Sequence, residues 1–255
     1  MLLIEEKGKV GVIMQLTIVL VKDRITLPIA TCETVQGLLY KAIAQDAPYA
    51  LSLHDGGRIF DGRKFKLFSF GEPEGRYEID GGNIVYLSRV RLTVRSADDY
   101  FIQLLLTYFT AGREVRLGNN TVTVGEVRLG DKRIYDGRIV IRTLSPITAY
   151  ITEPDGHTLY FTPQDSRFYD CLIANARRKY VGVFGTEEGF SLRIAPAEHA
   201  RFIKRATHFK TTLITAWHGQ FVLEGPPQVL ELLYNTGLGS KNSQGFGLFE
   251  TKAAY

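Results

Sequence analysis

The sequence predicts an α+β protein made of two ferredoxin-like (RRM-like) units in tandem, each with the order β-α-β-β-α-β. Three observations predict this fold class. Four segments carry apolar residues at the i, i+3, i+4 spacing of an amphipathic helix. Runs rich in Val, Ile, Thr, Tyr and Phe, with partial alternation, surround these helices. The order of strands and helices is the same in both halves of the chain, which is typical of the split βαβ arrangement.

The first unit is expected to contain four strands and two helices. The strands are predicted at Val12–Lys22, Lys64–Phe70, Ile84–Val94 and Thr121–Leu129. The first helix follows Thr31, a suitable N-cap, and its apolar stripe begins at Val35 and Leu38. The second helix is expected between an N-cap at Ser96 and Gly112, which ends it.

The second unit repeats this pattern. Its strands are predicted at Arg138–Thr152, Phe190–Ala206, Phe209–Leu223 and Phe246–Thr251. Thr162–Pro163 opens a helix that runs to about Arg177, and Pro226–Pro227 opens another that Gly237 stops. The polar, turn-rich stretch Asp131–Gly137 separates the units. We therefore expect domains at residues 1–134 and 135–255.

Composition limits the classes of function. The 255 residues are 45% hydrophobic and suffice for two small domains. No window reaches the roughly 18 uninterrupted apolar residues of a membrane helix. The first residues, MLLIEEKGKV, carry two glutamates where an export signal needs cations and then a long apolar run, so we expect a cytoplasmic protein. Residues 1–13 are an extension if translation starts at Met14. The net charge of +4 permits a polyanionic partner without requiring one.

The two cysteines, Cys32 and Cys171, stand in no metal-binding or redox spacing. Free cysteine is among the most buried residue types, so both are expected to pack as small apolar groups. No cofactor is expected.

Residues 237–247 read GLGSKNSQGFG and link the last predicted helix to the last strand. Backbone N–H groups of such a loop can form an anion-binding concavity, to which Lys241 would add a positive charge. No Gly-Lys-Ser/Thr opens a helix, so the segment is not a P-loop. The alternative is a flexible connection with one exposed lysine.

The same segment resembles the glycine-rich loop of the RAMP superfamily of CRISPR systems, which has the form G-h-G-x-x-x-x-x-G-h-G with h hydrophobic. The match is complete, and QGLLYKAI, TLSPITAYI and TTLITAWHGQF extend the resemblance over nearly the whole chain. Together they resemble the CRISPR endoribonuclease that cuts repeat transcripts into guide RNAs. A generic tandem RRM-like RNA binder is disfavoured by the complete glycine pattern.

The resemblance implies a nuclease that binds CRISPR repeat RNA and cleaves the precursor transcript into crRNA. The ribose 2′-OH would attack the phosphate, leaving a 2′,3′-cyclic phosphate and a 5′-OH, and this chemistry needs no metal. The alternative is a RAMP subunit that binds crRNA within an effector complex and does not cut. Contacts with effector subunits and homodimer formation are left open.

The candidate catalytic residues are Tyr40, His54 and Arg58. Among five histidines, His54 stands out because it is expected in a loop after the first helix and before a Gly-Gly break. Tyr40 lies about 130° from the centre of the apolar stripe of its helix, where it could also pack at the edge of the core. Both match the family's catalytic tyrosine and histidine, with the roles of base and acid left open.

Arg58 stands where the family has a lysine. Arginine can stabilise negative charge but cannot give up a proton, so Arg58 is assigned to charge stabilisation alone. Lys64 and Lys66 are the alternatives for this position.

The candidate RNA contacts lie in the glycine-rich loop and on the strands of the second unit. In the loop they are Gly237, Gly239, Lys241, Asn242, Ser243, Gly245, Phe246 and Gly247. This loop could instead brace the cleft between the units, a role that suits Leu238 and Phe246. Lys204 and Arg205 are expected on central strands, and Lys132 and Arg133 near the domain joint. Arg177–Lys179 end the third helix, where cations ordinarily compensate the helix dipole.

Overall fold

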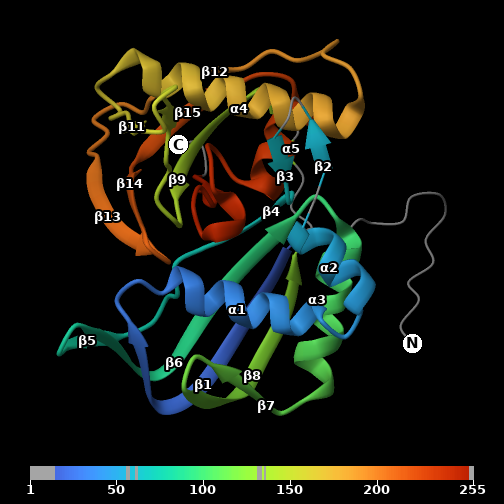
Figure 1. Ribbon diagram of the computed structural model, residues 1–255, viewed down its shortest axis with the longest axis vertical. Coiled ribbons are helices and arrows are strands. Elements are labelled where there is room, and N and C mark those ends of the chain that lie inside the picture. The colour runs from blue at the N-terminus through green and yellow to red at the C-terminus, as the bar shows by residue number, and fades with distance from the viewer. Residues whose placement is uncertain (1–14, 56–57, 61–62, 131–133, 135, 253–255) are drawn as a thin grey trace.

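The computed structural model describes residues 15–55, 58–60, 63–130, 134 and 136–252, and of residues 58–60, 63 and 64 it describes the backbone alone. Figure 1 shows two sheets, one above the other, with α1 (Cys32–Ile43) across the lower one and α4 (Ser166–Phe184) across the upper one. The predicted N-terminal extension, residues 1–13, lies outside the described residues.

The lower sheet is antiparallel and has the strand order β4-β6-β1-β8-β7, with β5 pairing β6. Its strands are β1 (Gln15–Pro28), β4 (Phe68–Phe70), β5 (Tyr77–Asp80), β6 (Asn83–Ser96), β7 (Glu114–Leu117) and β8 (Asn120–Gly130). The order β4-β6-β1-β8 is that of a ferredoxin-like sheet. The helices α1 and α3 (Asp99–Ala111) contact each other and the sheet.

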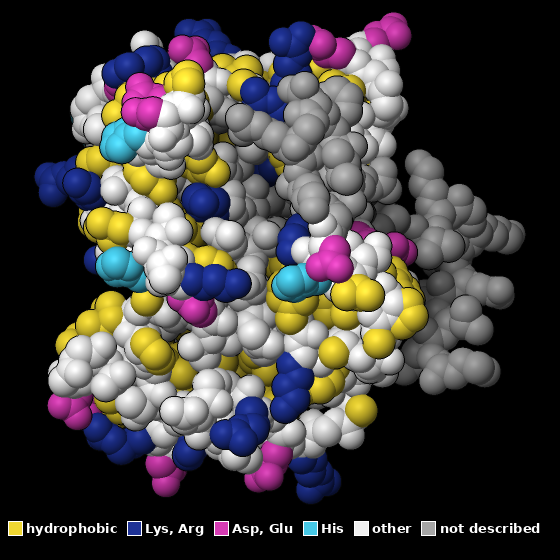
Figure 2. Space-filling model, viewed as in Figure 1, with side chains coloured by type: hydrophobic (Ala, Val, Ile, Leu, Met, Phe, Trp, Pro, Cys, Tyr) yellow, Lys and Arg dark blue, Asp and Glu magenta, His cyan; other side chains and the backbone are white. Residues whose placement is uncertain are grey.

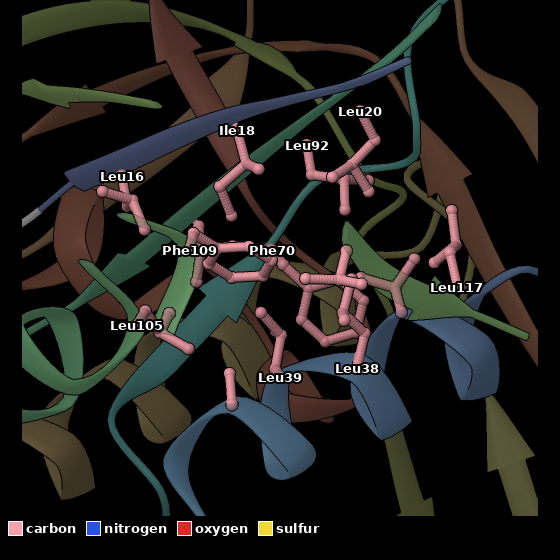
Figure 3. Packing of buried hydrophobic residues seen from close by; sticks show 14 of the residues in the cluster. Leu16, Ile18, Leu20, Leu38, Leu39, Phe70, Leu92, Leu105, Phe109 and Leu117 are labelled. Atoms are coloured by element: carbon pink, nitrogen blue, oxygen red, sulfur yellow. The ribbon is translucent and has the colours of Figure 1, made fainter. Parts of the chain in front are cut away.

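The core of this first unit forms where one face of β1 meets the apolar stripes of both helices. Leu16, Ile18 and Leu20 alternate along β1 and are fully buried. Figure 3 shows them facing Leu38 and Leu39 of α1, as the periodicity predicts.

The upper sheet has the order β12-β15-β9-β16. Its strands are β9 (Arg138–Thr143), β12 (Arg193–Pro196), β15 (Gln220–Glu224) and β16 (Phe249–Thr251). The helices α4 and α5 (Pro227–Thr236) complete the second βαββαβ unit, so the predicted fold class is confirmed. The predicted boundary falls largely outside the described residues, and the exact domain limits stay a prediction.

Several predicted elements are interrupted. The stretch Arg138–Thr152 contains β9 and, after a break, β10 (Tyr150–Thr152), which pairs with β11 (Thr158–Tyr160). Phe190–Ala206 and Phe209–Leu223 are each broken as well, because a hairpin of β13 (Ile203–Phe209) and β14 (Thr212–His218) is inserted between β12 and β15.

Other elements were not predicted or end elsewhere. A short helix α2 (Ala47–Asp55) and a hairpin of β2 (Arg58–Phe60) and β3 (Arg63–Phe65) lie between α1 and β4. The N-cap of α3 is Asp98, whose carboxylate accepts from the N–H of Tyr100, and Ser96 instead accepts from the N–H of Asp98. Thr31 precedes α1 but its side chain makes no capping hydrogen bond.

A buried arginine joins the two units. Arg95 of β6 is 3% exposed and donates to the carbonyl oxygens of Tyr234 and Phe249 in the second unit. Its guanidinium carbon lies 3.6 Å from the centre of the Tyr234 ring. Within the described part of the chain, no helix is both long and apolar enough to cross a membrane.

Candidate active site

Three side chains from separate elements meet beside the junction of the two units. Tyr40 lies in the last turn of α1, His54 in the last turn of α2, and Lys66 directly after β3. The Tyr40 and His54 rings meet edge to face, with their centroids 5.8 Å apart and their planes at 79°. The Lys66 ammonium lies 2.8 Å from the Tyr40 hydroxyl and 3.0 Å from the carbonyl oxygen of His54.

Tyr40 is held at the edge of the core. Its ring packs against Phe68 with centroids 6.3 Å apart, and the residue is half-buried. Burial raises the pKa of Tyr40 to about 12, so the phenol keeps its proton near neutral pH. Because Lys66 donates to its oxygen, the phenol can donate its own proton to another acceptor.

His54 lies on a helix rather than in the loop that the sequence predicted. Its side chain is 67% exposed, and Nδ1 lies 2.8 Å from a carboxylate oxygen of Asp55. This contact favours a proton on Nδ1, so Nε2 is the nitrogen that can accept a proton from a substrate.

The third predicted position, Arg58, is not tested by the described atoms. Arg58 is on β2, and its side chain lies outside the described atoms, as does that of Lys64. Among the described residues, the cation in contact with Tyr40 is Lys66, one of the two lysines considered as alternatives.

The glycine-rich loop 237–247 is a closely packed structure and not a slack connection. It contains the 3₁₀ turn η1 (Asn242–Gln244), and Gly237, Gly239, Gly245 and Gly247 all have positive φ. A Cβ on Gly247 would lie 1.9 Å from the carbonyl oxygen of Leu238. The glycines are therefore required by backbone geometry and by close approach.

A buried lysine anchors this loop. Lys179 is 3% exposed, and its ammonium donates to the Gly237 carbonyl at 2.7 Å and to the Asn242 side-chain oxygen at 2.6 Å. Burial lowers the pKa of Lys179 to about 7. The expectation that Lys179 ends its helix is wrong, because α4 continues to Phe184.

The loop also reaches the helix that carries Tyr40. Gln36 of α1 donates from Nε2 to the carbonyl oxygen of Ser243 at 2.6 Å. Lys241 is half-exposed and places its ammonium 5.1 Å from the centre of the Tyr150 ring. The loop thus connects the second unit to α1.

A pocket of about 430 Å³ is lined by both Lys66 and the loop. Its walls are Phe65–Phe68 from the first unit and Tyr150, Lys179 and Ser240–Gln244 from the second. In Figure 2, Lys, Arg and His side chains gather on this face around the junction of the two units. The Tyr40 phenol, the His54 imidazole and the Lys66 ammonium together offer a proton donor, a proton acceptor and a cation, a set suited to cleaving a phosphodiester.

Residues 129–251 match the family model described as "CRISPR associated protein Cas6, C-terminal". These residues are thus similar to the C-terminal part of Cas6 proteins. The resemblance to the repeat-RNA-processing endoribonucleases of the RAMP superfamily, inferred from the sequence, is thereby confirmed.

Two relatives match most of the chain. The "CRISPR-associated endoribonuclease Cas6" of Pyrococcus furiosus is 26% identical over 226 residues, which cover 86% of this chain and 81% of that protein. The "CRISPR-associated endoribonuclease Cas6 1" of Methanocaldococcus jannaschii is 25% identical over 204 residues, covering 75% and 76%.

Solved structures share the fold. One described as "Characterization of a Cas6-related gene from Pyrococcus furiosus" has a TM-score of 0.81 at 18% identity, covering 95% of this chain and 99% of that one. Another, "An RAMP protein binding different RNA substrates", has a TM-score of 0.79 at 20% identity, covering 94% and 99%.

Within the glycine-rich loop, the predicted RNA contacts divide into buried and accessible residues. Phe246 is fully buried and Asn242 is 8% exposed, with its amide donating to the Leu238 and Phe246 carbonyls. These two side chains brace the loop from inside. Phe246 is not accessible to RNA, contrary to the prediction, whereas Asn242 also lines the pocket. Lys241 and Ser243 line the pocket and remain accessible.

The remaining basic candidates lie elsewhere. Lys204 and Arg205 are exposed on β13, which belongs to the inserted hairpin and not to a central strand as predicted. Lys132 and Arg133 lie outside the described residues. Among the described residues of this Cas6 relative, no three His, Cys, Asp or Glu side chains are placed as a metal site would require.

Proposed function

We propose that this chain is an endoribonuclease that binds CRISPR repeat RNA and cleaves the precursor transcript into crRNA guides without a metal ion. The observation that carries the proposal is the contact of Tyr40 with both His54 and Lys66. The curated relatives named as Cas6 endoribonucleases support the reaction class.

The proposed reaction is an attack of a ribose 2′-oxygen on the adjacent phosphorus. His54 Nε2 takes the proton of the 2′-OH as the P–O2′ bond forms. Tyr40 gives its proton to the 5′-oxygen as the P–O5′ bond breaks. The products are a 2′,3′-cyclic phosphate and a 5′-OH.

The raised pKa of Tyr40 supports its assignment as the acid, because a phenol that holds its proton is a poor base at neutral pH. Lys66, 2.8 Å from the phenolic oxygen, stabilises the phenolate that forms and then returns a proton to it. Arg58 stays a candidate for stabilising charge on the phosphate.

The test is cleavage of a repeat-containing transcript in EDTA. We expect cutting at one site, and His54→Ala should lower the single-turnover rate by about 10²- to 10⁴-fold while RNA binding is kept. His157→Ala is the matched control, since His157 is also 67% exposed beside a carboxylate. A 2′-deoxy substitution at the attacking ribose should abolish cleavage.

Binding without cutting at any enzyme excess would contradict the proposal and favour the non-cleaving RNA-binding subunit. Loss of cutting in EDTA would contradict metal independence. Cytoplasmic location, effector-complex partners and a homodimer stay predictions from the sequence.

A further inference from the structure

The pocket next to the catalytic residues contains an aromatic ring that the cleavage mechanism does not use. Tyr150 lies on β10, the first strand of the hairpin inserted between β9 and α4. It is half-buried and lines the pocket together with Lys66. Its ring pairs with that of Tyr160 on β11, with centroids 5.5 Å apart. The hairpin therefore holds the Tyr150 ring in place.

A cation lies over this ring. The Lys241 ammonium is 5.1 Å from the ring centre, and the side chains of Ser240 and Ser243 line the same pocket. An aromatic face beside an ammonium and two hydroxyls matches the two halves of a nucleotide, since a base stacks on aromatic rings and a phosphate binds ammonium and hydroxyl groups.

We propose that this pocket binds one unpaired nucleotide of the RNA next to the cleaved phosphate, with its base on Tyr150 and its phosphate at Lys241. The inference rests on the proposed function, because it takes RNA as the ligand. The volume of about 430 Å³ lies within the range of small-molecule sites, roughly 300–1,000 Å³. The nucleotide must be unpaired, because a paired base has both faces stacked inside the duplex.

The ammonium does not block the ring. Lys241 is half-exposed, and a cation–π contact of an exposed lysine is weaker than base–aromatic stacking. When a nucleotide enters, its phosphate attracts the ammonium and its base takes the ring face.

The test is an abasic scan of repeat RNA made uncleavable by a 2′-deoxy substitution at the cut. In the wild type, one abasic position beside the cut should weaken binding about 5- to 150-fold. In Tyr150→Ala the same abasic RNA should bind no worse than intact RNA. Tyr150→Leu, which keeps most of the side-chain volume, should behave like Tyr150→Ala, and Tyr150→Phe should behave like the wild type.

Tyr77→Ala is the control, because Tyr77 is an exposed tyrosine of β5 that does not line the pocket. It should keep the wild-type abasic profile. Lys241→Ala should lower the salt slope of binding by about 0.7 to 0.9, and Tyr150→Ala should leave the slope unchanged.

Equal abasic profiles in the wild type, Tyr150→Ala and Tyr150→Leu would overturn the proposal. If the uncut transcript is cleaved normally but the abasic profiles are equal, only the proposed nucleotide site is wrong and the nuclease proposal stands. If the abasic effect disappears in the Tyr150 variants as expected but the RNA is never cut, the nuclease proposal is wrong and the nucleotide site is supported. Failure to bind repeat RNA at all would overturn both.

Discussion

Replacing Lys179 with methionine removes a buried ammonium while keeping most of the side-chain volume. The lysine is enclosed between α4 and the glycine-rich loop, where it donates to Gly237 and Asn242. Burial lowers its pKa from 10.5 to about 7, so the folded protein releases this proton near neutral pH. The unfolded chain keeps the proton until about pH 10.5.

The sign of the effect follows from the number of protons bound in each state. Between pH 7 and 10.5 the unfolded chain binds one proton more, so the free energy of unfolding rises with pH. At about 1.36 kcal/mol per pH unit, the wild type should gain about 2.5 kcal/mol between pH 6 and 9 from this residue. The acceptors of the ammonium oppose the shift, so this value is an upper limit.

Urea denaturation at several pH values between 6 and 9 measures the effect. The difference in unfolding free energy between the wild type and Lys179→Met should change by up to about 2.5 kcal/mol in favour of the wild type as the pH rises. Lys241→Met is the control, because this half-exposed lysine of the same loop should give a curve parallel to the wild type. Parallel curves for Lys179→Met and the wild type would refute the reasoning.

Two further predictions concern the loop and the catalytic cation. Gly247→Ala should cost roughly 2–4 kcal/mol in urea denaturation, because its Cβ would meet the Leu238 carbonyl, whereas Gly156→Ala, at positive φ with open space, should cost about 1 kcal/mol. Equal losses of unfolding free energy in the two variants would show that the positive φ, and not the close contact with Leu238, determines the cost. Lys66→Met should slow single-turnover cleavage by about 100-fold or more with repeat-RNA affinity changed less than about threefold. A large loss of affinity with an unchanged rate would place Lys66 in binding.

The sequence could single out the two rings that meet in the structure because each carries a local signal. Tyr40 lies off the apolar stripe of a strongly periodic helix, and His54 comes shortly before two consecutive glycines in the sequence. The sequence does not predict α2, the helix that contains His54. Leu53 is the one buried residue of α2, so the helix has no apolar stripe to recognise. The choice of Lys66 depends on where the β2–β3 hairpin returns the chain, which no local pattern specifies.

Lys179 was misassigned although the sequence contained a usable signal. Phe168, Leu172 and Ala176 form the buried stripe of α4, and Lys179 continues it three residues further along. A lysine on an apolar stripe is expected to have buried acceptors, because an unpaired buried charge is too costly. A helix that ends at about Arg177 excludes Lys179, so the predicted helix does not show that this lysine lies on the buried stripe.

The glycine-rich loop braces the structure, as one interpretation of its sequence predicts, and leaves side chains accessible for the RNA contact that stays a prediction. Its buried side chains, Leu238, Asn242 and Phe246, face the interior, while Ser240 and Lys241 face the pocket. The buried side chains of the loop are held by close backbone contacts that only glycine permits. Because these contacts fix the backbone, they also fix the direction of the side chains that face the pocket. A residue of the loop can therefore affect RNA binding without touching RNA. For this reason the salt dependence of binding, and not the loss of affinity alone, separates phosphate contacts from supporting residues.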